Sequence, residues 1–174
     1  MALTFAHIKD TPIGQISLFA GDHGLQGVAF KNLTRVKEDL SFLDDGPSLH
    51  GLETLGTLLV EINAYLFGIQ RVFSVDIDWD IIDGFQREVL AITAEIPYGK
   101  VVTYGEIAQE LGKPGAARAV GSALSHNPMP IVIPCHRVIG ADRVLRGYIG
   151  GEDIKAFLLR LEGHTITGSP LMVR

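Results

Sequence analysis

The stretch Ile131-Val-Ile-Pro-Cys-His-Arg-Val138 contains the only cysteine of the 174-residue sequence. Its three β-branched residues favour a buried strand, and Pro134 removes the next backbone hydrogen-bond donor and fixes its own φ. The residue before the proline, Ile133, is biased towards extended geometry. We therefore expect a strand that ends in a stiff corner, with the thiol of Cys135 on it and the imidazole of His136 beside it. A lone thiol in this place is either a small core residue or a nucleophile.

The composition is that of a chain able to bury a sizeable core, as one domain or two small ones. Hydrophobic residues make up 47% of the sequence, but Gly, Pro or charge interrupts every apolar run, so no membrane span is expected. The N-terminus shows no basic region followed by an apolar core, and we expect no signal peptide. A single cysteine cannot form an internal disulfide, which fits a reducing cytosol and predicts a cytoplasmic protein.

Charge is distributed unevenly between the two halves of the chain. The net charge is −5, with 5 Lys/Arg and 12 Asp/Glu in residues 1–83 but 10 and 8 in residues 84–174. Phosphate contacts come from local basic clusters and not from the whole-chain total. The C-terminal half is therefore the half in which a nucleic-acid-binding face is expected.

The N-terminal half is predicted to contain a small antiparallel sheet. Polar–apolar alternation indicates strands, and tight turns rich in Gly separate them. Residues 31–47 are polar and end in a turn signal, which indicates a connection. The expected strands are residues 3–8, 15–19 and 25–30, with turns at 11–14 and 21–24, and a last strand at 72–77.

A helix is predicted between the connection and that last strand. Ser48 is its expected N-cap, and Gly68 is its expected end. Apolar residues at helical spacing predict one buried face. The residues of this face are Leu52, Leu55, Leu59, Ile62 and Leu66.

Four aspartates follow, at positions 76, 78, 80 and 83. Alternation would place the first three on one face of a strand, but no glycine turn or distal Glu stands at the spacing of a calcium loop. We interpret them as a solvated strand edge and a linker. The domain boundary is placed there, which gives domains at residues 1–82 and 83–174.

The C-terminal half is predicted to be mostly helical. Asp83 is the expected N-cap of a helix that residues 97–100 end, and Thr103 follows a short β-branched pair and caps the next helix, residues 104–111. Residues 112–115 form a tight turn before a helix at 116–125, which makes a helix-turn-helix pattern. The same pattern also fits an ordinary helical hairpin. The buried face of the first helix is expected to contain Phe85, Val89, Ile92 and Ile96.

The last of these helices has little side-chain bulk on one side, which suits either close approach by another surface or tight core packing. Arg118 is its only charged residue, and it is either a surface ion-pair partner or, with Lys113 and Lys100, a group that faces phosphates or probes a base stack. The small residues are Ala116, Ala117, Ala119, Gly121, Ser122 and Ala123.

The run Arg118-Ala-Val-Gly-Ser-Ala-Leu-Ser-His-Asn127-Pro-Met-Pro-Ile-Val-Ile-Pro-Cys135-His-Arg-Val138 resembles the O6-alkylguanine-DNA alkyltransferases, also called methylated-DNA–protein-cysteine methyltransferases. The likeness includes residues 96–104, 147–151 and 158–163, and it is strong over residues 84–163 and weak at the 11–14 turn. It implies an α+β fold: a small N-terminal antiparallel sheet with a helix, ribonuclease-like, then a mostly helical domain with a helix-turn-helix, winged-helix-like.

The resemblance also implies a reaction. An alkyl group on O6 of guanine, and by extension O4 of thymine, moves to a thiolate by in-line displacement at carbon, which needs a soft and strong nucleophile. Cys135 is then the nucleophile and acceptor, His136 its base through a water, and Glu162 the residue that orients the imidazole. Because a thioether has no hydrolytic exit and no second cysteine exists, we expect each chain to act once.

Further roles come from the resemblance alone. The base leaves the stack to reach a pocket; Arg118 takes its place, Tyr104 binds the base ring and crowds the adjoining phosphate, and Asn127 braces the turn before the cysteine. The small-residue helix enters the minor groove, with Ala116, Ala117, Arg118, Gly121 and Ser122 as the DNA-binding residues. The pocket wall is expected to contain Pro130, Leu145, Tyr148 and Ile149.

Three features depart from the family pattern. Arg143 and Arg146 replace residues that are usually Gly or small, and they are expected to add phosphate contacts. Ile149 replaces Ser or Ala and is expected to narrow the pocket against large adducts. The N-terminal half lacks the cysteines that bind zinc in some members, and six scattered histidines show no ligand spacing. We expect no metal, no cofactor and no membrane, with double-stranded DNA as the partner of a monomer.

Other classes of protein fit parts of the pattern. A binding-only alkyltransferase-like protein lacks the cysteine that this chain has. A helix-turn-helix regulator would not require Cys135 or Glu162. Such a regulator usually binds DNA as a dimer. A Cys–His hydrolase turns over and needs an oxyanion hole that the sequence does not reveal.

Overall fold

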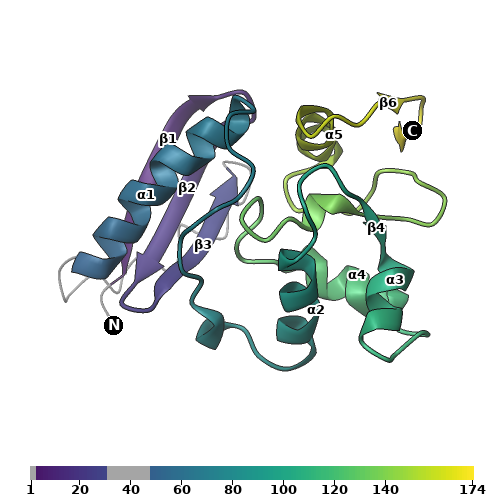
Figure 1. Cartoon of the computed structure of the whole chain (residues 1–174), viewed down its shortest axis with the longest axis horizontal. Helices are drawn as coiled ribbons and strands as arrows, with labels where there is room; N and C mark the ends of the chain where they lie inside the picture. The colour runs from purple at the N-terminus through teal and green to yellow at the C-terminus, as the bar shows by residue number, and fades with distance from the viewer. Residues whose placement is uncertain (1–2, 31–47) are drawn as a thin grey trace. The chain divides into compact units, whose positions relative to one another are not determined.

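The structure is a computed structural model that describes residues 3–30 and 48–174 (Figure 1). It divides into two compact units, Met1–Ile81 and Ile82–Arg174. The predicted α+β class is confirmed, because an antiparallel sheet occupies the first unit and helices dominate the second. In the described part of the chain, no helix is long and apolar enough to cross a membrane. The predicted connection at 31–47 lies outside the described residues.

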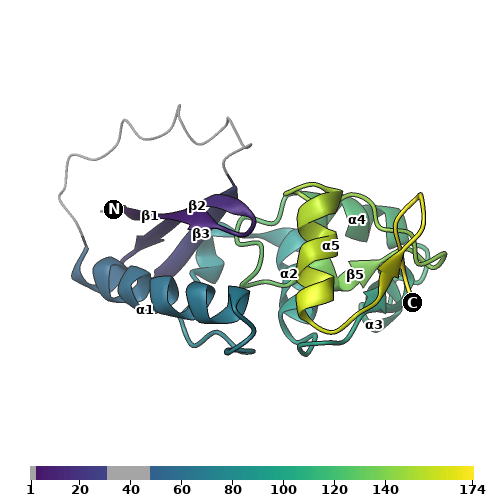
Figure 2. The same cartoon turned by 90° about the horizontal axis from the view of Figure 1, so that it is seen from above.

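The first unit is a three-stranded antiparallel meander with one helix lying across it (Figures 1 and 2). In register, Leu18 of the middle strand lies opposite Ala6 and Val28. The first strand runs further than predicted, since only residues 12–13 turn the chain before the second strand. The elements are β1 (Thr4–Thr11), β2 (Gly14–Gly21), β3 (Gly24–Phe30) and α1 (Leu49–Leu66).

Helix α1 begins as predicted, because the Ser48 side chain accepts a hydrogen bond from the Gly51 amide at 3.1 Å. Its buried face, however, was predicted wrongly in part. A Cβ at Gly51 would lie 3.1 Å from the Ala20 carbonyl oxygen, so a small residue lets the helix approach the sheet here. Leu52, next to it, is consequently turned outward and Leu59 is only partly buried, and the side chains that pack on the sheet include Leu55, Leu58, Ile62, Tyr65 and Leu66.

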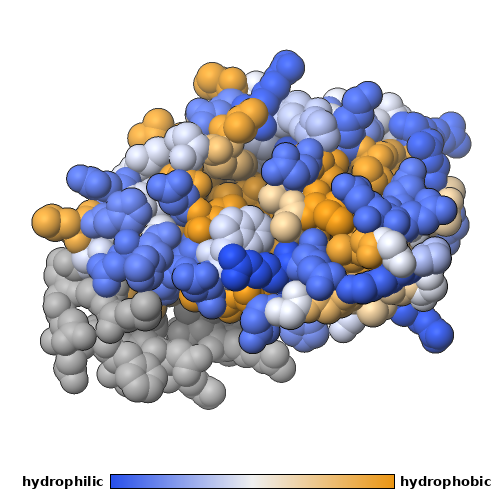
Figure 3. Space-filling view, turned by 60° about the horizontal axis from the view of Figure 1, so that its bottom comes forward, coloured by the Kyte–Doolittle hydropathy of each residue, from blue (hydrophilic) through white to orange (hydrophobic). Residues whose placement is uncertain are grey.

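The outer face of α1 also carries apolar residues, which is why periodicity alone selected the buried face only in part. Leu49 is 80% exposed and Val60 is 70% exposed. Beyond the helix, Phe67, Ile69 and Val72 are also exposed. Figure 3 shows one face of the molecule on which hydrophobic residues reach the surface among hydrophilic ones.

The predicted last strand at 72–77 is wrong. A single parallel bridge joins Ile77 to Leu25, made by hydrogen bonds from the Leu25 amide to the Asp76 carbonyl and from the Asp78 amide to the Leu25 carbonyl. Asp78 is not solvated as predicted: it is buried, and its carboxylate accepts a hydrogen bond from the side-chain amide of Gln26 at 2.8 Å. A buried aspartate thus fastens the segment that precedes the 3₁₀ turn η3 (Trp79–Ile81).

In the second unit the predicted helix-turn-helix is confirmed. Thr103 and Glu106 form a reciprocal capping box at the start of the first of its two helices. Asp83 holds the N-cap position of the preceding helix, but its side chain makes no cap hydrogen bond there. The helices are α2 (Gly84–Ala94), α3 (Tyr104–Glu110), α4 (Ala117–Ser125) and α5 (Glu152–Leu161), with the 3₁₀ turn η4 (Cys135–Arg137) between the last two.

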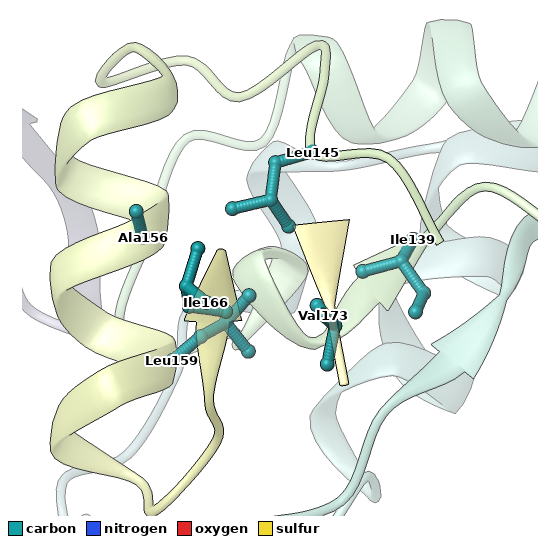
Figure 4. Packing of buried hydrophobic residues seen from close by; sticks show 6 residues of the cluster. All are labelled: Ile139, Leu145, Ala156, Leu159, Ile166 and Val173. Atoms are coloured by element: carbon teal, nitrogen blue, oxygen red, sulfur yellow. The ribbon is translucent and has the colours of Figure 1, made fainter. Parts of the chain in front are cut away.

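Short strands tie this unit together. The parallel pair β4 (Val102–Thr103) and β5 (Val138–Ile139) joins the helix-turn-helix to the chain that follows Cys135. The antiparallel hairpin β6 (Ile166–Thr167) and β7 (Met172–Val173) follows α5. A buried cluster lies between α5, β5 and this hairpin and consists of Ile139, Leu145, Ala156, Leu159, Ile166 and Val173 (Figure 4).

Candidate functional site

The backbone that leads to Cys135 is a turn, so the strand predicted at 131–133 is wrong. Ile131 has a φ of 77°, and the Ile133 amide donates to the Met129 carbonyl at 2.9 Å. Pro134 then forms the centre of an inverse γ-turn, with φ −81° and ψ 59° and a 2.8 Å hydrogen bond from the Cys135 amide to the Ile133 carbonyl. The predicted stiff corner exists. The β-branched residues before it are explained by burial of this segment and not by a strand.

Asn127 replaces a neighbouring strand as the hydrogen-bond partner of this turn. Its side-chain amide donates to the Ile133 carbonyl at 2.9 Å, and its oxygen accepts from the Met129 amide at 3.0 Å. The same amide nitrogen donates to Cys135 Sγ at 3.1 Å. Because Asn127 is fully buried, one side chain fixes both the turn and the thiol.

Cys135, His136 and Arg137 form a single 3₁₀ turn and not part of a strand. All three are buried, and His136 is completely so. Three consecutive side chains therefore leave one turn in different directions, each into the protein. Burial of a thiol, an imidazole and a guanidinium together requires partners that compensate the loss of water.

Glu162, at the end of α5, is the partner of two of them. His136 Nε2 donates to one of its carboxylate oxygens at 2.8 Å, and the Arg137 guanidinium donates to both oxygens at 2.9–3.1 Å. The Gly99 amide adds a further hydrogen bond at 3.0 Å, and Arg137 also donates to the Ile96 carbonyl. The buried carboxylate is thus paired with a cationic guanidinium and accepts hydrogen bonds from two further donors. Since Nε2 is used for Glu162, Nδ1 is the ring nitrogen through which the imidazole can accept a proton.

Burial sets the resting protonation states of the site. It raises the pKa of the Cys135 thiol to about 11, although the Asn127 hydrogen bond and the Lys155 charge oppose it. Burial also lowers the pKa of His136, against the effect of Glu162. At neutral pH the thiol therefore keeps its proton and the imidazole is neutral, which is the form that can receive that proton.

Lys155, a residue that the sequence interpretation missed, contributes a buried positive charge. Only 1% of it is exposed, and its ammonium donates to the Val138 carbonyl at 2.7 Å and the Arg146 carbonyl at 3.2 Å. Burial lowers its pKa to about 8, and its charge lowers the pKa of Cys135. The sequence contains a pattern that could have revealed the burial of Lys155. Lys155 and Glu162 are two helical turns apart, and they share one face of α5 with the apolar residues Leu158 and Leu159.

Tyr104 approaches the same loop from α3. Its hydroxyl lies 3.5 Å from the Arg146 carbonyl that also accepts from Lys155. Burial and the nearby Cys135 raise the pKa of the phenol, and Arg146 opposes them. A Cβ added at Gly121 of α4 would lie 3.8 Å from the Tyr104 ring. The small side of α4 thus packs on Tyr104 at this point.

The remaining predicted site residues fall into two groups. Pro130, Leu145 and Tyr148 are buried near the centre, where the Tyr148 ring meets the His136 ring edge-on at 6.3 Å, and Ile149 is half-buried. On α4, Arg118 and Ser122 are exposed, whereas Ala116, Ala117 and Gly121 are half-buried.

Two of the basic residues considered for phosphate contacts are paired with acidic side chains in the structure. Lys113 pairs with Glu88 at 2.7 Å and lies over the Phe85 ring. On the loop after β5, Arg146 pairs with Asp142 at 2.5 Å while 61% of its side chain is exposed. Among residues 3–30 and 48–174, no group of three His, Cys, Asp or Glu is arranged to hold a metal ion.

A helix-turn-helix in the same unit as a buried cysteine beside a His–Glu pair is the arrangement expected of a DNA-binding protein with a reactive cysteine. Residues 84–164 match the model of the "6-O-methylguanine DNA methyltransferase, DNA binding domain" family. The methylated-DNA–protein-cysteine methyltransferase of Methanosarcina acetivorans is 42% identical over 90% of this chain and 96% of its own length, and that of Mycolicibacterium paratuberculosis is 42% identical over 88% of each chain.

Solved structures agree with these relatives. A single-residue variant of the Mycobacterium tuberculosis O6-methylguanine methyltransferase has a TM-score of 0.76 at 38% identity, covering 92% of each chain. The Mycobacterium tuberculosis protein in complex with DNA also has a TM-score of 0.76 at 38% identity, over 91% of each chain. The chain belongs to the methylated-DNA–protein-cysteine methyltransferase family, whose members act in DNA repair by alkyl transfer.

Proposed function

We propose that Cys135 accepts, once per chain, the alkyl group, typically methyl, carried by O6 of guanine or O4 of thymine in double-stranded DNA. The observation that carries this proposal is the buried thiol itself, which Asn127 holds at 3.1 Å on the turn that also presents the His136–Glu162 pair. The M. tuberculosis relative in complex with DNA supports the choice of partner. Residues 83–174 form the domain that contains every group involved, and residues 1–82 form a scaffold domain.

The proposed transfer balances as a single displacement. Cys135 Sγ attacks the alkyl carbon, the S–C bond forms, and the C–O bond breaks with its electron pair going to the base. The thiol proton passes to Nδ1 of His136, through a bridging water, and the released base takes up one proton. Glu162 and Arg137 are positioning residues that fix the imidazole, and the Lys155 charge favours the thiolate.

Access to the thiol requires the damaged base to leave the duplex, because Cys135 is buried. In the proposed complex the small face of α4 enters the minor groove and Arg118 fills the gap in the stack. Tyr104 binds the base ring, and the base lies against Pro130, Leu145, Tyr148 and Ile149. The exposed residues Arg143 and Arg146 contact phosphates, and Ile149 disfavours large adducts. One copy acts per lesion, in the cytoplasm, without a cofactor or metal.

The decisive experiment incubates the full chain with a duplex that contains one O6-methylguanine and measures the intact mass of the protein. The proposal expects one methyl group gained per chain and none in Cys135→Ala. The Met172→Ala variant, changed at an exposed side chain outside the proposed pocket, serves as a control that retains the thiol. Tight binding without mass gain would overturn the proposal in favour of a binding-only protein, and many released products per chain would favour a hydrolase.

A further inference from the structure

The loop between β5 and α5 is fastened to the end of the chain. The Leu145 amide donates to the Leu171 carbonyl at 2.8 Å, and the Val173 amide donates to the Arg143 carbonyl at 3.0 Å. Between these two bonds, Val144 and Met172 form an antiparallel bridge. The β6–β7 hairpin therefore extends onto residues 143–145 as a third, short antiparallel segment.

Side-chain packing reinforces these backbone bonds. Leu145 from the loop and Val173 from β7 lie in the buried cluster with Ile166, Leu159 and Ala156 (Figure 4). Leu145 is 1% exposed and Val173 is 3% exposed. The neighbouring residue of β7, Met172, is 37% exposed, as alternation along a strand requires. Val173 thus points into the cluster, and Met172 does not.

The fastened residues lie directly before the mouth loop, which we define as residues 146–149. The Arg146 carbonyl accepts from the Lys155 ammonium at 3.2 Å and lies 3.5 Å from the Tyr104 hydroxyl. Gly147 has a φ of 64°, and a Cβ there would lie 3.9 Å from the same hydroxyl. Any shift of residues 143–145 therefore moves the mouth loop relative to Tyr104 and Lys155.

We propose that the β6–β7 hairpin determines specificity, because it holds the mouth loop close to Tyr104 and so limits the size of the alkyl group that reaches Cys135. The inference rests on the proposed function, in which Tyr148 and Ile149 of this loop line the pocket. The hairpin touches no substrate: it is a positioning element. It begins shortly after Glu162, so the segment that follows α5 returns to pair with the loop that precedes α5.

The test compares transfer from duplexes that contain O6-methylguanine or O6-benzylguanine, measured as single-turnover rates by intact mass. In Val173→Ala, the loosened loop admits the larger group, so the benzyl-to-methyl rate ratio rises at least about fivefold while the methyl rate changes by less than about threefold. Met172→Ala, on the exposed side of the same strand, and Val173→Ile both keep the wild-type ratio. A chain that lacks residues 171–174 shows a larger rise than Val173→Ala.

Several results would overturn the inference. Parallel losses of both rates in Val173→Ala would show that the hairpin only supports the fold, and an unchanged ratio in both Val173→Ala and the truncated chain would show that it does not reach the pocket. If Met172→Ala and Val173→Ala changed the benzyl-to-methyl rate ratio equally, packing of Val173 in the buried cluster would not be the cause of the change. Absence of methyl gain in the wild-type chain would instead overturn the proposed function, on which this inference depends.

Discussion

Replacing Lys155 by methionine separates what this residue does for the fold from what it does for the thiol. Burial lowers the pKa of Lys155 from 10.5 to about 8. The unfolded chain therefore binds more protons than the folded chain between these two values, and wild-type stability rises with pH across that window. Below about pH 8 Lys155 is charged in the folded chain, and burial of this charge lowers the free energy of unfolding by about 3 kcal/mol.

Lys155→Met removes this penalty but also leaves the Val138 and Arg146 carbonyls without their ammonium donor. Hydrogen bonds to charged groups contribute about 1.5–3 kcal/mol each, so at pH 7 the variant is between equally stable and about 3 kcal/mol less stable than the wild type. The decisive quantity is the pH dependence. Between pH 7 and 9.5 the free energy of unfolding of the wild type rises by about 2 kcal/mol relative to that of Lys155→Met, because the buried lysine is deprotonated.

The same variant slows transfer at neutral pH. Without the cation the pKa of the Cys135 thiol rises further, and one pKa unit corresponds to about a tenfold smaller thiolate fraction. Above pH 8 the wild-type lysine loses its own proton, so the ratio of wild-type to variant rates falls with pH.

Two measurements check this reasoning: denaturant unfolding from pH 7 to 9.5, and single-turnover methyl transfer over the same range. Leu159→Met, a change in the neighbouring cluster without loss of charge, is the control. The reasoning would be refuted if the stabilities of wild type and Lys155→Met changed in parallel with pH and the ratio of their transfer rates did not depend on pH. Lys155 would then not be a buried cation that acts on the Cys135 thiol.

Three further predictions concern other parts of the site. Glu162→Gln leaves the buried Arg137 guanidinium without its anion and costs about 3–5 kcal/mol in denaturant unfolding; adding Arg137→Met restores part of that stability but not the transfer rate. Asn127→Ala leaves the Met129 amide and the Ile133 carbonyl without their hydrogen-bond partner and lowers the free energy of unfolding by about 2–4 kcal/mol. Unchanged stability of this variant would contradict the bracing role of Asn127. Arg146→Ala reduces the slope of log affinity for DNA against log salt by about 1. Asp142→Ala, which frees the arginine and removes the acceptor of the Val144 amide, keeps that slope.

Much of the scaffold could be predicted because its signals are local. Ser48 and Thr103 cap their helices through side-chain bonds within three residues, and the alternation of β2 is legible from the sequence alone. The turn at Ile131–Ile133 could not be predicted in this way. Its partner is the side chain of Asn127, and no local pattern shows that an amide will take the place of a strand. Apolar residues also lie on the outer face of α1, so periodicity identified Leu55, Ile62 and Leu66 but wrongly included Leu52.

The site was predictable to different depths. The roles assigned to Cys135, His136 and Glu162 came from the resemblance, and the structure brings these residues to one buried centre. Arg137 and Lys155 were missed because charged residues are usually interpreted as surface groups. Their burial becomes intelligible only when the partners are in place, since Arg137 neutralises Glu162 and Lys155 is bound by two carbonyls.

The high pKa of the Cys135 thiol is compatible with its proposed role as a nucleophile. An exposed thiolate reacts with any electrophile or oxidant that it meets, and a chain that acts only once cannot recover from such a reaction. A buried thiol with a pKa of about 11 stays protonated and inaccessible, so a neutral His136 and a cationic Lys155 have to act together with a correctly placed alkyl carbon. Under the proposed function, the desolvation that makes the resting thiol unreactive is therefore also what restricts the reaction to a base held in the pocket.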